Sequence, residues 1–467
     1  MAKYDLVIIG SGPGGYVAGI RAGQWGLRTL VVEKDPFLGG TCLHVGCIPT
    51  KVLLHHADIY DNFLRASEFG FDLDVKSVRV NWPAMIARKQ KIVTKHAKGI
   101  EFLFRKNKVE SMTGWGRVSG PGRVTVEKDG KTTEIETKYT MLATGSEARS
   151  LPGVEFDGKT IVSNREILEL PSIPKSLVVV GSGAVGVEFA SIFKTFGTEV
   201  TILEMLPRAV PLEDEEISAE LQKAYKKRGI RVELEARVEN VRKDAKGATV
   251  AFKDKAGNPQ SLSAETVLIA VGRRPLTENV GIEKTAAKVE RGFVHTTPYM
   301  ETAEPGLYAI GDIVAGQPQL AHAASMQGII AVGRMAGKEV QPFDRRRCPN
   351  ATYCEPQIGS IGLTERQARE AGFNVKTGKF PFVGNSKASI LGNHEGFIKV
   401  VAEEKYGEIL GVHAIGPLAT EIIAEPVTAL GLEATLDDMA ATIHAHPTVW
   451  EAMGDAFNSV RGLSINA

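Results

Sequence analysis

The chain has 467 residues, of which 43% are hydrophobic, so it has room for about three domains with full cores. Its 56 basic and 55 acidic residues leave a net charge of +1, which argues against a nucleic-acid or anionic-membrane partner. Four cysteines, no apolar run near the length of about 20 residues that a membrane-spanning helix needs, and no leader pattern at the start predict a cytoplasmic protein.

The first predicted elements form a strand, turn, helix and strand unit. A short apolar strand over 4–9 enters a glycine-rich turn, and a helix follows over about 14–26. A second strand over 29–33 ends on an acid that lies 23 positions after the first glycine of the turn. This combination is the fingerprint of a dinucleotide-binding fold, and an ordinary glycine-rich turn is the alternative.

Each residue of this fingerprint has its own expected task. Gly10 would make the tight turn, Gly12 would let the backbone approach a pyrophosphate, and Gly15 would let the helix pack closely on the strand. Glu33 would accept hydrogen bonds from ribose hydroxyls.

Cys42 and Cys47 stand five positions apart in the next stretch. This spacing permits a small, strained and reducible disulfide, which is a two-electron acceptor. Lys51 and the start of a helix predicted from about Ile48 would favour a thiolate there. Two buried cysteines that never meet are the alternative, and a metal pair with His44 is disfavoured because no fourth ligand lies at metal spacing.

The strand, turn, helix and strand unit then returns. A strand over 176–180 enters a glycine-rich turn, a helix runs to about residue 196, and a strand over 199–204 ends on an acid 23 positions after the first glycine. Glu204 indicates a free ribose 2′-hydroxyl and hence NAD, since NADP would require arginines that Arg208, four residues later, does not supply. The predicted nucleotide-binding residues are Gly181, Gly183, Gly186 and Glu204.

Three further strands are expected to support these two units. Apolar strands near 140–145 and 267–272 end in glycine at comparable places, where the chain leaves each nucleotide-binding domain. A strand over 306–311 precedes Asp312 and a helix over about 319–335. Asp312 could accept a hydrogen bond from a cofactor sugar chain, and a plain surface turn is the alternative.

The last part of the chain has an α+β pattern. Alternating strands over 397–402 and 408–415 predict a hairpin, and helices are expected near 419–432 and 448–460. Pro426 interrupts the first of these helices. Such a layer has room to build a subunit interface.

His446 stands before a helix predicted to start with Pro447, and Glu451 lies one turn inside that helix. The glutamate could orient the imidazole and raise its basicity, which is the arrangement of a general base with its orienting group. The alternative is a capping histidine and a solvated glutamate.

Together these motifs resemble the pyridine nucleotide-disulfide oxidoreductases over essentially the whole chain. The resemblance rests on Gly-Gly-Thr-Cys-Leu-x-Val-Gly-Cys-Ile-Pro-x-Lys at 39–51, the two fingerprints, Ile-Gly-Asp at 310–312, and His-Pro-Thr-x-x-Glu at 446–451. It implies an α/β protein with two Rossmann-like dinucleotide-binding domains and an α+β C-terminal dimerisation domain. The implied boundaries are 1–148 for the first part of the FAD-binding domain, 149–276 for the NAD-binding domain, 277–346 for the second, central part of the FAD-binding domain, and 347–467 for the interface domain.

The resemblance also implies roles for single residues. Cys42 would exchange with the substrate, and Cys47 would pack against the flavin. Lys51 would lie beside the flavin and pair with Glu188. The catalytic set is completed by His446 and Glu451; the remaining cofactor positions are Gly114, Thr144, Gly145, Asp312 and Ala321 for FAD, and Gly272 for NAD.

The implied activity is the oxidation of a dihydrolipoyl group to its disulfide, with electrons passing through the cysteine pair and FAD to NAD. The implied partners are a second copy of the chain and a lipoyl-bearing acyltransferase or glycine-cleavage carrier protein of a 2-oxoacid dehydrogenase-type complex. A glutathione-type or mercuric reductase of the same family is one alternative. A non-catalytic flavin redox sensor is another.

A few residues depart from the family pattern. His44 replaces the usual asparagine, and His55 and His56 replace small polar residues, so the pH dependence of thiol reactivity is open. Cys348 and Cys354 stand where no cysteines are expected, and we predict no disulfide between them in a reducing cytoplasm.

Overall fold

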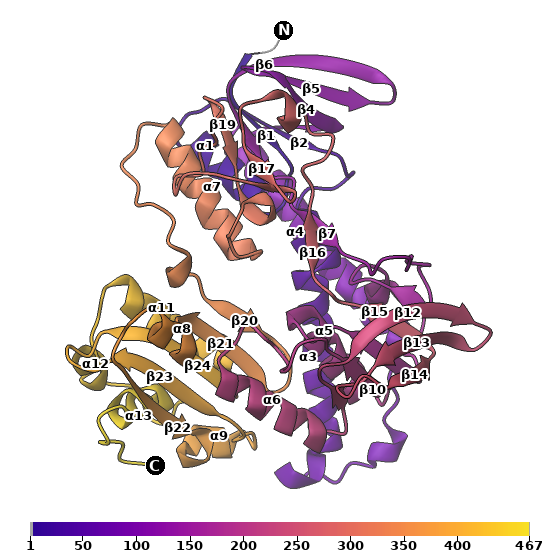
Figure 1. Cartoon of the computed structure of the whole chain (residues 1–467), viewed down its shortest axis with the longest axis vertical. Coiled ribbons are helices and arrows are strands. Elements are labelled where there is room, and N and C mark those ends of the chain that lie inside the picture. Colours follow the sequence, from indigo (N-terminus) through magenta and orange to yellow (C-terminus); the bar gives the residue numbers. More distant parts are fainter. Residues whose placement is uncertain (1–2, 467) are drawn as a thin grey trace. The chain divides into compact units, whose positions relative to one another are not determined.

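The computed structural model describes residues 3–466, and these residues form two compact units (Figure 1). The first unit contains residues 3–52, 83–149 and 273–345, and the second contains residues 53–82, 150–272 and 346–466. Helices α3 (Cys47–Leu64) and α4 (Trp82–Lys106) each begin in one unit and continue into the other. The three predicted domain boundaries remain predictions.

A seven-stranded mixed sheet forms the core of the first unit. Strands β19, β6, β1, β2 and β3 are parallel neighbours, whereas β4, β5 and β6 form an antiparallel meander. The bounds are β1 (Lys3–Ile9), β2 (Thr29–Glu33), β3 (Glu110–Thr113), β4 (Trp115–Gly120), β5 (Arg123–Lys128), β6 (Lys131–Leu142) and β19 (Leu307–Ala309). The strands predicted over 4–9 and 29–33 are confirmed. The strand predicted near 140–145 is the end of β6, whose first half is polar and largely exposed and therefore lacks the apolar signal.

Helices α1 (Pro13–Gln24) and α7 (Ala321–Met335) pack against each other in the first unit (Figure 1). Small residues allow this close packing, since a Cβ atom added at Gly14 would lie 3.2 Å from the Cβ of Ala324. The helices predicted over 14–26 and 319–335 are thus confirmed, with ends that differ by two residues.

The second unit contains a parallel sheet in the order β11, β10, β9, β15, β8 and an antiparallel meander β12, β13, β14. The second fingerprint is confirmed as β9 (Ser176–Val180), α5 (Ala184–Thr195) and β10 (Glu199–Leu203). The other elements are β8 (Ile161–Val162), α6 (Glu215–Lys227), β11 (Arg231–Glu233), β12 (Arg237–Asp244), β13 (Gly247–Lys253), β14 (Pro259–Ala264) and β15 (Thr266–Ile269).

A five-stranded antiparallel sheet in the order β20, β21, β24, β23, β22 follows in the same unit (Figure 1). Its bounds are β20 (Asn350–Thr352), β21 (Gln357–Gly362), β22 (Val375–Pro381), β23 (Phe397–Glu403) and β24 (Ile409–Gly416), and its helices are α8 (Glu365–Glu370), α9 (Ser386–Ile390), α10 (Ala419–Ile422), α11 (Ala424–Gly431), α12 (Leu436–Ala440) and α13 (Glu451–Ser459). The predicted hairpin is β23 and β24. The helix predicted near 419–432 is divided at Ile423, and Pro426 lies in the first turn of α11, where its missing N–H costs no hydrogen bond.

The remaining elements are short. They are α2 (Gly40–Val45), β7 (Ser146–Ala148), β16 (Arg273–Pro275), β17 (Val289–Glu290), β18 (Phe293–Val294), and single 3₁₀ turns at Ala66–Phe69, Val75–Ser77, Glu166–Glu169, Ile282–Lys284, Gly311–Ile313, Arg345–Arg347 and Phe382–Gly384. None of the helices within residues 3–466 is both long and apolar enough to cross a membrane.

Candidate active site

The first glycine-rich turn has the geometry that a dinucleotide site requires. Gly10 has φ +105°, and a Cβ atom there would lie 2.3 Å from the carbonyl oxygen of Ala143. A Cβ atom at Gly15 would lie 1.9 Å from the carbonyl oxygen of Gly10, so only glycine lets α1 pack this closely on β1. A Cβ atom at Gly12 would meet no other atom within 4 Å, which leaves open space for a phosphate against the backbone.

Ser11 connects this turn to two neighbouring segments. Its N–H and its hydroxyl both donate to Oε2 of Glu33, at 2.9 and 2.6 Å. Its carbonyl oxygen accepts from the N–H of Gly39 at 3.1 Å, just before α2. A Cβ atom at Gly40 would lie 2.6 Å from the Cα of Gly12, so the start of α2 lies directly against the turn. The segment that carries the cysteines is therefore fixed to the first fingerprint.

A pocket of about 310 Å³ opens beside Glu33, at the carboxyl ends of β2 and β3. Its walls come from the loop after β2, the end of α4 and the end of β3; they are Glu33, Asp35, Pro36, Phe37, Leu38, Glu101, Phe104, Arg105, Val109, Ser111, Met112 and Thr113. Gly114 follows directly and donates its N–H to the carbonyl oxygen of Glu33 at 2.8 Å. The pocket has the size of a small-molecule site and suits the adenosine part of FAD, with Glu33 and Gly114 at its edge.

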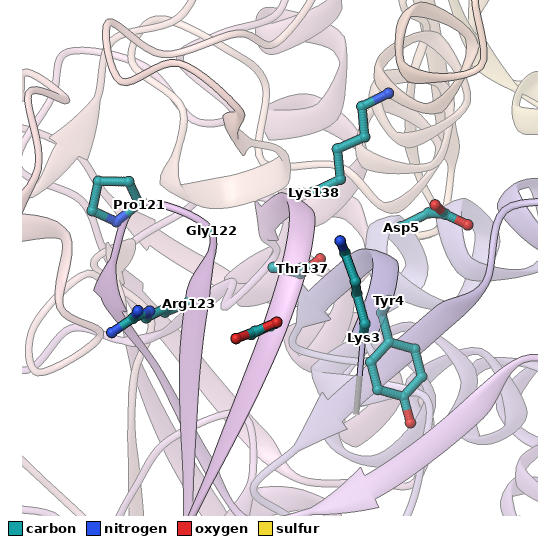
Figure 2. A pocket seen from close by; sticks show the side chains of 9 residues that line it. Lys3, Tyr4, Asp5, Pro121, Gly122, Arg123, Thr137 and Lys138 are labelled. Atoms are coloured by element: carbon teal, nitrogen blue, oxygen red, sulfur yellow. The ribbon is translucent and has the colours of Figure 1, made fainter. Parts of the chain in front are cut away.

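A larger hollow of about 560 Å³ lies at the other end of β1 (Figure 2). Lys3, Arg123 and Lys138 line it together with Asp5 and Glu136. Lys3 begins β1, and its register partner is Glu136 of β6. Because ligands of open parallel sheets bind at the carboxyl ends of the strands, this hollow is separate from the predicted cofactor site.

Three adjacent parallel strands bring the other predicted FAD residues to one edge. The ends of β1, β6 and β19 are in register, with Ile9 opposite Leu142 and Leu142 opposite Ala309. Gly10, Thr144 and Asp312 follow these ends, so they share the same edge of the sheet.

Thr144 and Asp312 already have protein partners at this edge. The hydroxyl of Thr144 donates to the carbonyl oxygen of Leu276 at 2.5 Å. The Asp312 carboxylate accepts from the hydroxyl of Ser146 and lies 3.8 Å from Nε of Arg273. Gly145 accepts from the N–H of Leu276, and Ala321 is the first residue of α7. A carboxylate oriented by Ser146 and Arg273 at this edge suits hydrogen bonds to a polyhydroxyl chain.

Cys42 lies in α2, and Cys47 is the first residue of α3, one residue earlier than the helix start that the sequence predicts. Both are thiols in this structure, and a hydrogen bond joins them. This bond, together with burial, raises the pKa of Cys42, although the charge of Lys51 acts in the opposite direction. The predicted help from Lys51 is real but is outweighed at Cys42, because a thiol that donates to a neighbouring sulfur holds its proton firmly.

His44 points toward the wall of the adenosine pocket. Its Nε2 lies 2.9 Å from the carbonyl oxygen of Leu38, and its ring stacks on Phe37 with 5.8 Å between ring centroids. Within residues 3–466, no three His, Cys, Asp or Glu side chains are placed to share a metal ion. His44 thus holds the loop after β2.

The second glycine-rich turn repeats the first in detail. A Cβ atom at Gly181 would lie 2.4 Å from the carbonyl oxygen of Ala270, and one at Gly186 would lie 2.0 Å from the carbonyl oxygen of Gly181. At Gly183 a Cβ atom would meet nothing within 4 Å. Gly272, which ends this segment, has φ +106°. The two turns therefore offer the same open space for a pyrophosphate.

Glu204 is held like its counterpart in the first fingerprint. Its Oε2 accepts from the N–H and the hydroxyl of Ser182, both at 2.7 Å, and its Oε1 accepts from the N–H of Leu206 at 2.8 Å. Arg208 instead contacts Glu215 at 2.6 Å. These contacts hold the negative charge of Glu204 at the end of β10, which favours a ribose 2′-hydroxyl.

Glu188 is buried in α5, and its Oε1 accepts from the N–H of Tyr353 at 2.9 Å. Lys51 belongs to the first unit and Glu188 to the second. The ion pair predicted between them remains a prediction.

His446 and Glu451 lie together. Nδ1 of His446 is 2.8 Å from Oε1 of Glu451, and Oε2 of Glu451 accepts from the N–H of Thr448 at 2.8 Å. The predicted start of this helix at Pro447 is wrong, because α13 begins at Glu451. The Glu451 carboxylate reaches back from the first turn of α13 to His446 and to the N–H of Thr448, and so fixes both residues in the preceding loop.

The charge and exposure of this pair suit proton transfer. The pKa of Glu451 is lowered first by the Thr448 N–H, and then by the hydrogen bond and charge of His446 and by the charge of His444. The side chain of His446 is 71% exposed, so its other ring nitrogen is accessible in this chain. An ionised glutamate on one nitrogen and open space at the other is what a general base needs.

Four more residues depart from the family pattern and differ in how far they are buried; they are Cys348, Cys354, His55 and His56. The prediction that Cys348 and Cys354 form no disulfide stays a prediction. Cys354 is fully buried and donates to the carbonyl oxygen of Pro356 at 3.2 Å. His55 is exposed on α3, and His56 is buried.

Sequence reasoning missed two kinds of supporting residue. Ser11 and Ser182 fix the two ribose acids, and the signal for them was the repeated Gly-Ser-Gly of both turns. His444 contacts both carboxylate oxygens of Glu425 at 2.9 and 3.0 Å, which no local spacing indicates because the two residues are 19 positions apart.

Two family models match the chain. The model of the pyridine nucleotide-disulphide oxidoreductases matches residues 4–328. The model of their dimerisation domain matches residues 348–457.

Several known proteins are similar over nearly the whole chain. A dihydrolipoyl dehydrogenase of Bacillus subtilis is 42% identical, with 99% of each chain covered. A dihydrolipoyl dehydrogenase of Rhizobium etli is 40% identical, covering 100% of this chain and 99% of the relative. The crystal structure of LpdA from Mycobacterium tuberculosis matches with a TM-score of 0.90 and 26% identity, covering 98% of this chain and 99% of the other.

Proposed function

This chain belongs to the pyridine nucleotide-disulphide oxidoreductase family, and we propose that it is a dihydrolipoyl dehydrogenase that reduces NAD. The position of Cys42 in α2 and of Cys47 at the start of α3, with α2 fixed against the first nucleotide turn, is the observation that carries the proposal. The full-length similarity to dihydrolipoyl dehydrogenases supports the substrate.

FAD and NAD are the cofactors of this family, and the two turns fit them. The pocket beside Glu33 would hold the adenosine of FAD, Gly12 would lie under its pyrophosphate, and Asp312 would bind its ribityl chain. Glu204 would hold the adenosine ribose of NAD. Bound FAD would supply the link between two-electron sulfur chemistry and hydride transfer, which sulfur alone cannot make.

His446 would start the sulfur chemistry by taking the proton of a dihydrolipoyl thiol on its free ring nitrogen. The resulting thiolate attacks the sulfur of Cys42, a substrate–Cys42 disulfide forms, and the Cys42–Cys47 bond breaks with its electron pair left on Cys47. The second substrate thiol then displaces Cys42 and closes the substrate disulfide. The enzyme is left with Cys42 and Cys47 as a dithiol, which is its two-electron reduced state.

Glu451 would keep the imidazole in the right orientation and stabilise the imidazolium that forms. Lys51 and Glu188 would pair beside the flavin. The dimerisation domain supports a homodimer, and a lipoyl-bearing acyltransferase or a glycine-cleavage carrier protein would deliver the substrate. We expect this enzyme in the cytoplasm.

A steady-state comparison of substrates tests the function. With NAD or NADH, the purified protein should turn over dihydrolipoamide and lipoamide at least about 100-fold faster than oxidised glutathione or mercuric ion, because a specific dithiol site rejects the others. NADPH should be a poor donor. A higher kcat/KM for glutathione or mercuric ion would assign another reductase activity, and one reduction by NADH followed by no turnover would indicate a redox sensor.

Glu204→Ala should weaken NADH binding and narrow the preference for NADH over NADPH. Loss of the charged acceptor of two ribose hydroxyls should cost about 1.5 to 3 kcal/mol of binding free energy. KM values for both nucleotides measure this change. Glu199→Ala is the matched control, because Glu199 is exposed at the other end of β10. Equal use of NADH and NADPH by the unmutated enzyme would show that Glu204 does not discriminate between them.

A further inference from the structure

Asn385 is a buried polar residue that joins α9 to the loop between α12 and α13, called here the His446 loop (residues 441–450). It is 4% exposed and stands directly before α9. Its Oδ1 accepts from the N–H of Ala388 at 2.9 Å and so caps this helix. Its Nδ2 donates to the carbonyl oxygen of Thr448 at 3.1 Å, across 63 positions of the sequence. One side-chain amide therefore connects the start of α9 to the His446 loop.

Thr448 is held through both of its backbone polar groups. Its carbonyl oxygen accepts from Asn385, and its N–H donates to Oε2 of Glu451 at 2.8 Å. Oε1 of the same carboxylate lies 2.8 Å from Nδ1 of His446. A continuous chain of hydrogen bonds, each 3.1 Å or shorter, thus runs from Asn385 to the imidazole. The position of Thr448 therefore determines how the carboxylate faces His446.

The imidazole of His446 has few other supports. Its side chain is 71% exposed, and within residues 3–466 its one hydrogen-bond partner is Glu451. Val449, in contrast, is 1% exposed and belongs to the same hydrophobic cluster as Ala388 of α9. Packing at Val449 and the Asn385 bond at Thr448 are thus two anchors within three residues of His446.

We propose that Asn385 is a positioning residue that, through Thr448, holds the Glu451 carboxylate in the orientation in which it directs His446 to the substrate thiol. This inference rests on the proposed function of His446 as the base. A buried amide suits the task, because it offers a donor and an acceptor in fixed directions. Without the bond, Thr448 and the carboxylate could shift together, and a small misplacement of a reacting group lowers the rate strongly.

Two substitutions separate the bond to Thr448 from the cap of α9. Asn385→Ser and Asn385→Asp both keep an oxygen that can cap the helix. The serine hydroxyl ends one bond closer to the backbone than the amide nitrogen, and an ionised aspartate has no donor, so neither can replace the bond to Thr448. Each variant should lower kcat for dihydrolipoamide by about 10- to 100-fold, with KM within about threefold of the native value. Stopped-flow reduction of the flavin by NADH should keep its native rate.

The His446→Gln background distinguishes positioning from a general loss of structure. If Asn385 acts through the base, Asn385→Ser should slow a His446→Gln chain by less than about twofold further, because no base is left to position. Thr364→Ala is the matched control. Thr364 caps the short helix α8 in the same unit, and its hydrogen bonds stay within that helix. This control should melt at a lower temperature but keep the native kcat.

Three results would overturn the inference: native kcat in both Asn385 variants, equal slowing of both half-reactions, or the same loss in the native and the His446→Gln backgrounds. Bound FAD and dimer content show that each variant is folded. His446→Gln by itself reports on the proposed function. If it is nearly inactive while the Asn385 variants are native, only the positioning role fails; if it stays active, the assignment of the base fails as well.

Discussion

His446→Gln is expected to slow dihydrolipoamide oxidation by about 100- to 10,000-fold, the contribution of a positioned general base. The amide keeps the size and polarity of the side chain but cannot take a proton from a thiol. Flavin reduction by NADH should continue at the native rate, because hydride transfer does not use this base. Stopped-flow measurement of the two half-reactions checks both statements, and comparable slowing of both would mean that the substitution disturbs the cofactor site.

The dimerisation domain raises the question of which subunit's cysteines this base serves. In an isologous dimer every contact occurs twice, so a base that crosses the interface would complete two sites. A heterodimer of Cys47→Ser and His446→Ala chains decides the matter. If the base acts across the interface, one of its two sites is intact, and the heterodimer should recover about half the native activity although both parent homodimers are nearly inactive. Absence of recovery in verified heterodimers would assign the base to its own chain.

The nucleotide turns could be predicted in detail because their constraints are local. A Cβ atom at Gly15 would collide with the carbonyl oxygen of Gly10, which lies only five positions earlier in the sequence. Gly186 and Gly181 repeat this relation. Short spacing in sequence therefore determines the geometry directly. The ribose acids follow at the ends of adjacent parallel strands, which the same spacing also fixes.

The loop of His446 shows where a local signal misleads. Proline after a possible cap favours a helix start at Pro447, yet Glu451 accepts from the N–H of Thr448 and from His446. The spacing of Thr448 and Glu451 is that of a capping box, in which a glutamate reaches back to an N–H three residues earlier. That signal was present in the sequence, and it places the start of the helix after Thr448 and so closer to Glu451 than a start at Pro447.

Long-range polar contacts could not be predicted from one sequence. Glu425 and His444 lie on either side of α12, and Ser11 meets both Glu33 and Gly39 through the packing of three segments. Which side chain a polar residue meets depends on how the elements pack, and spacing carries no information about it.

A buried charge cluster in the second unit is another feature that only the structure reveals. Lys399 of β23 is 2% exposed, and its Nζ contacts Asp214 at 3.0 Å and Glu216 and Glu365 at 2.8 Å. Asp214 caps α6, and Glu365 begins α8, so one ammonium group joins the start of α6 to the C-terminal sheet. His413 lies nearby, but burial lowers its pKa. Lys399 is therefore the cation that directly contacts all three carboxylates.

Lys399→Met should lower the free energy of unfolding by about 3 to 5 kcal/mol, because it leaves the buried Asp214 carboxylate without its ion-pair partner. Thermal melting with saturating FAD measures the loss. Lys379→Met is the matched control, since Lys379 also pairs with Glu216 but is half exposed, and its loss should cost at most about 1 kcal/mol.

The pH dependence of the same variant identifies the cause. In the native protein burial raises the pKa of Asp214, but His413 and Lys399 outweigh it, so the pKa values of Asp214, Glu216 and Glu365 are lowered. Groups with lowered pKa values stabilise the fold above their unfolded values near pH 4 and lose that contribution as the pH falls. Without Lys399, burial should raise the pKa of the Asp214 carboxyl above its unfolded value, so the variant should instead gain stability as the pH falls from 8 to 5. A loss that is the same at every pH would mean that packing, and not the uncompensated charge, is responsible.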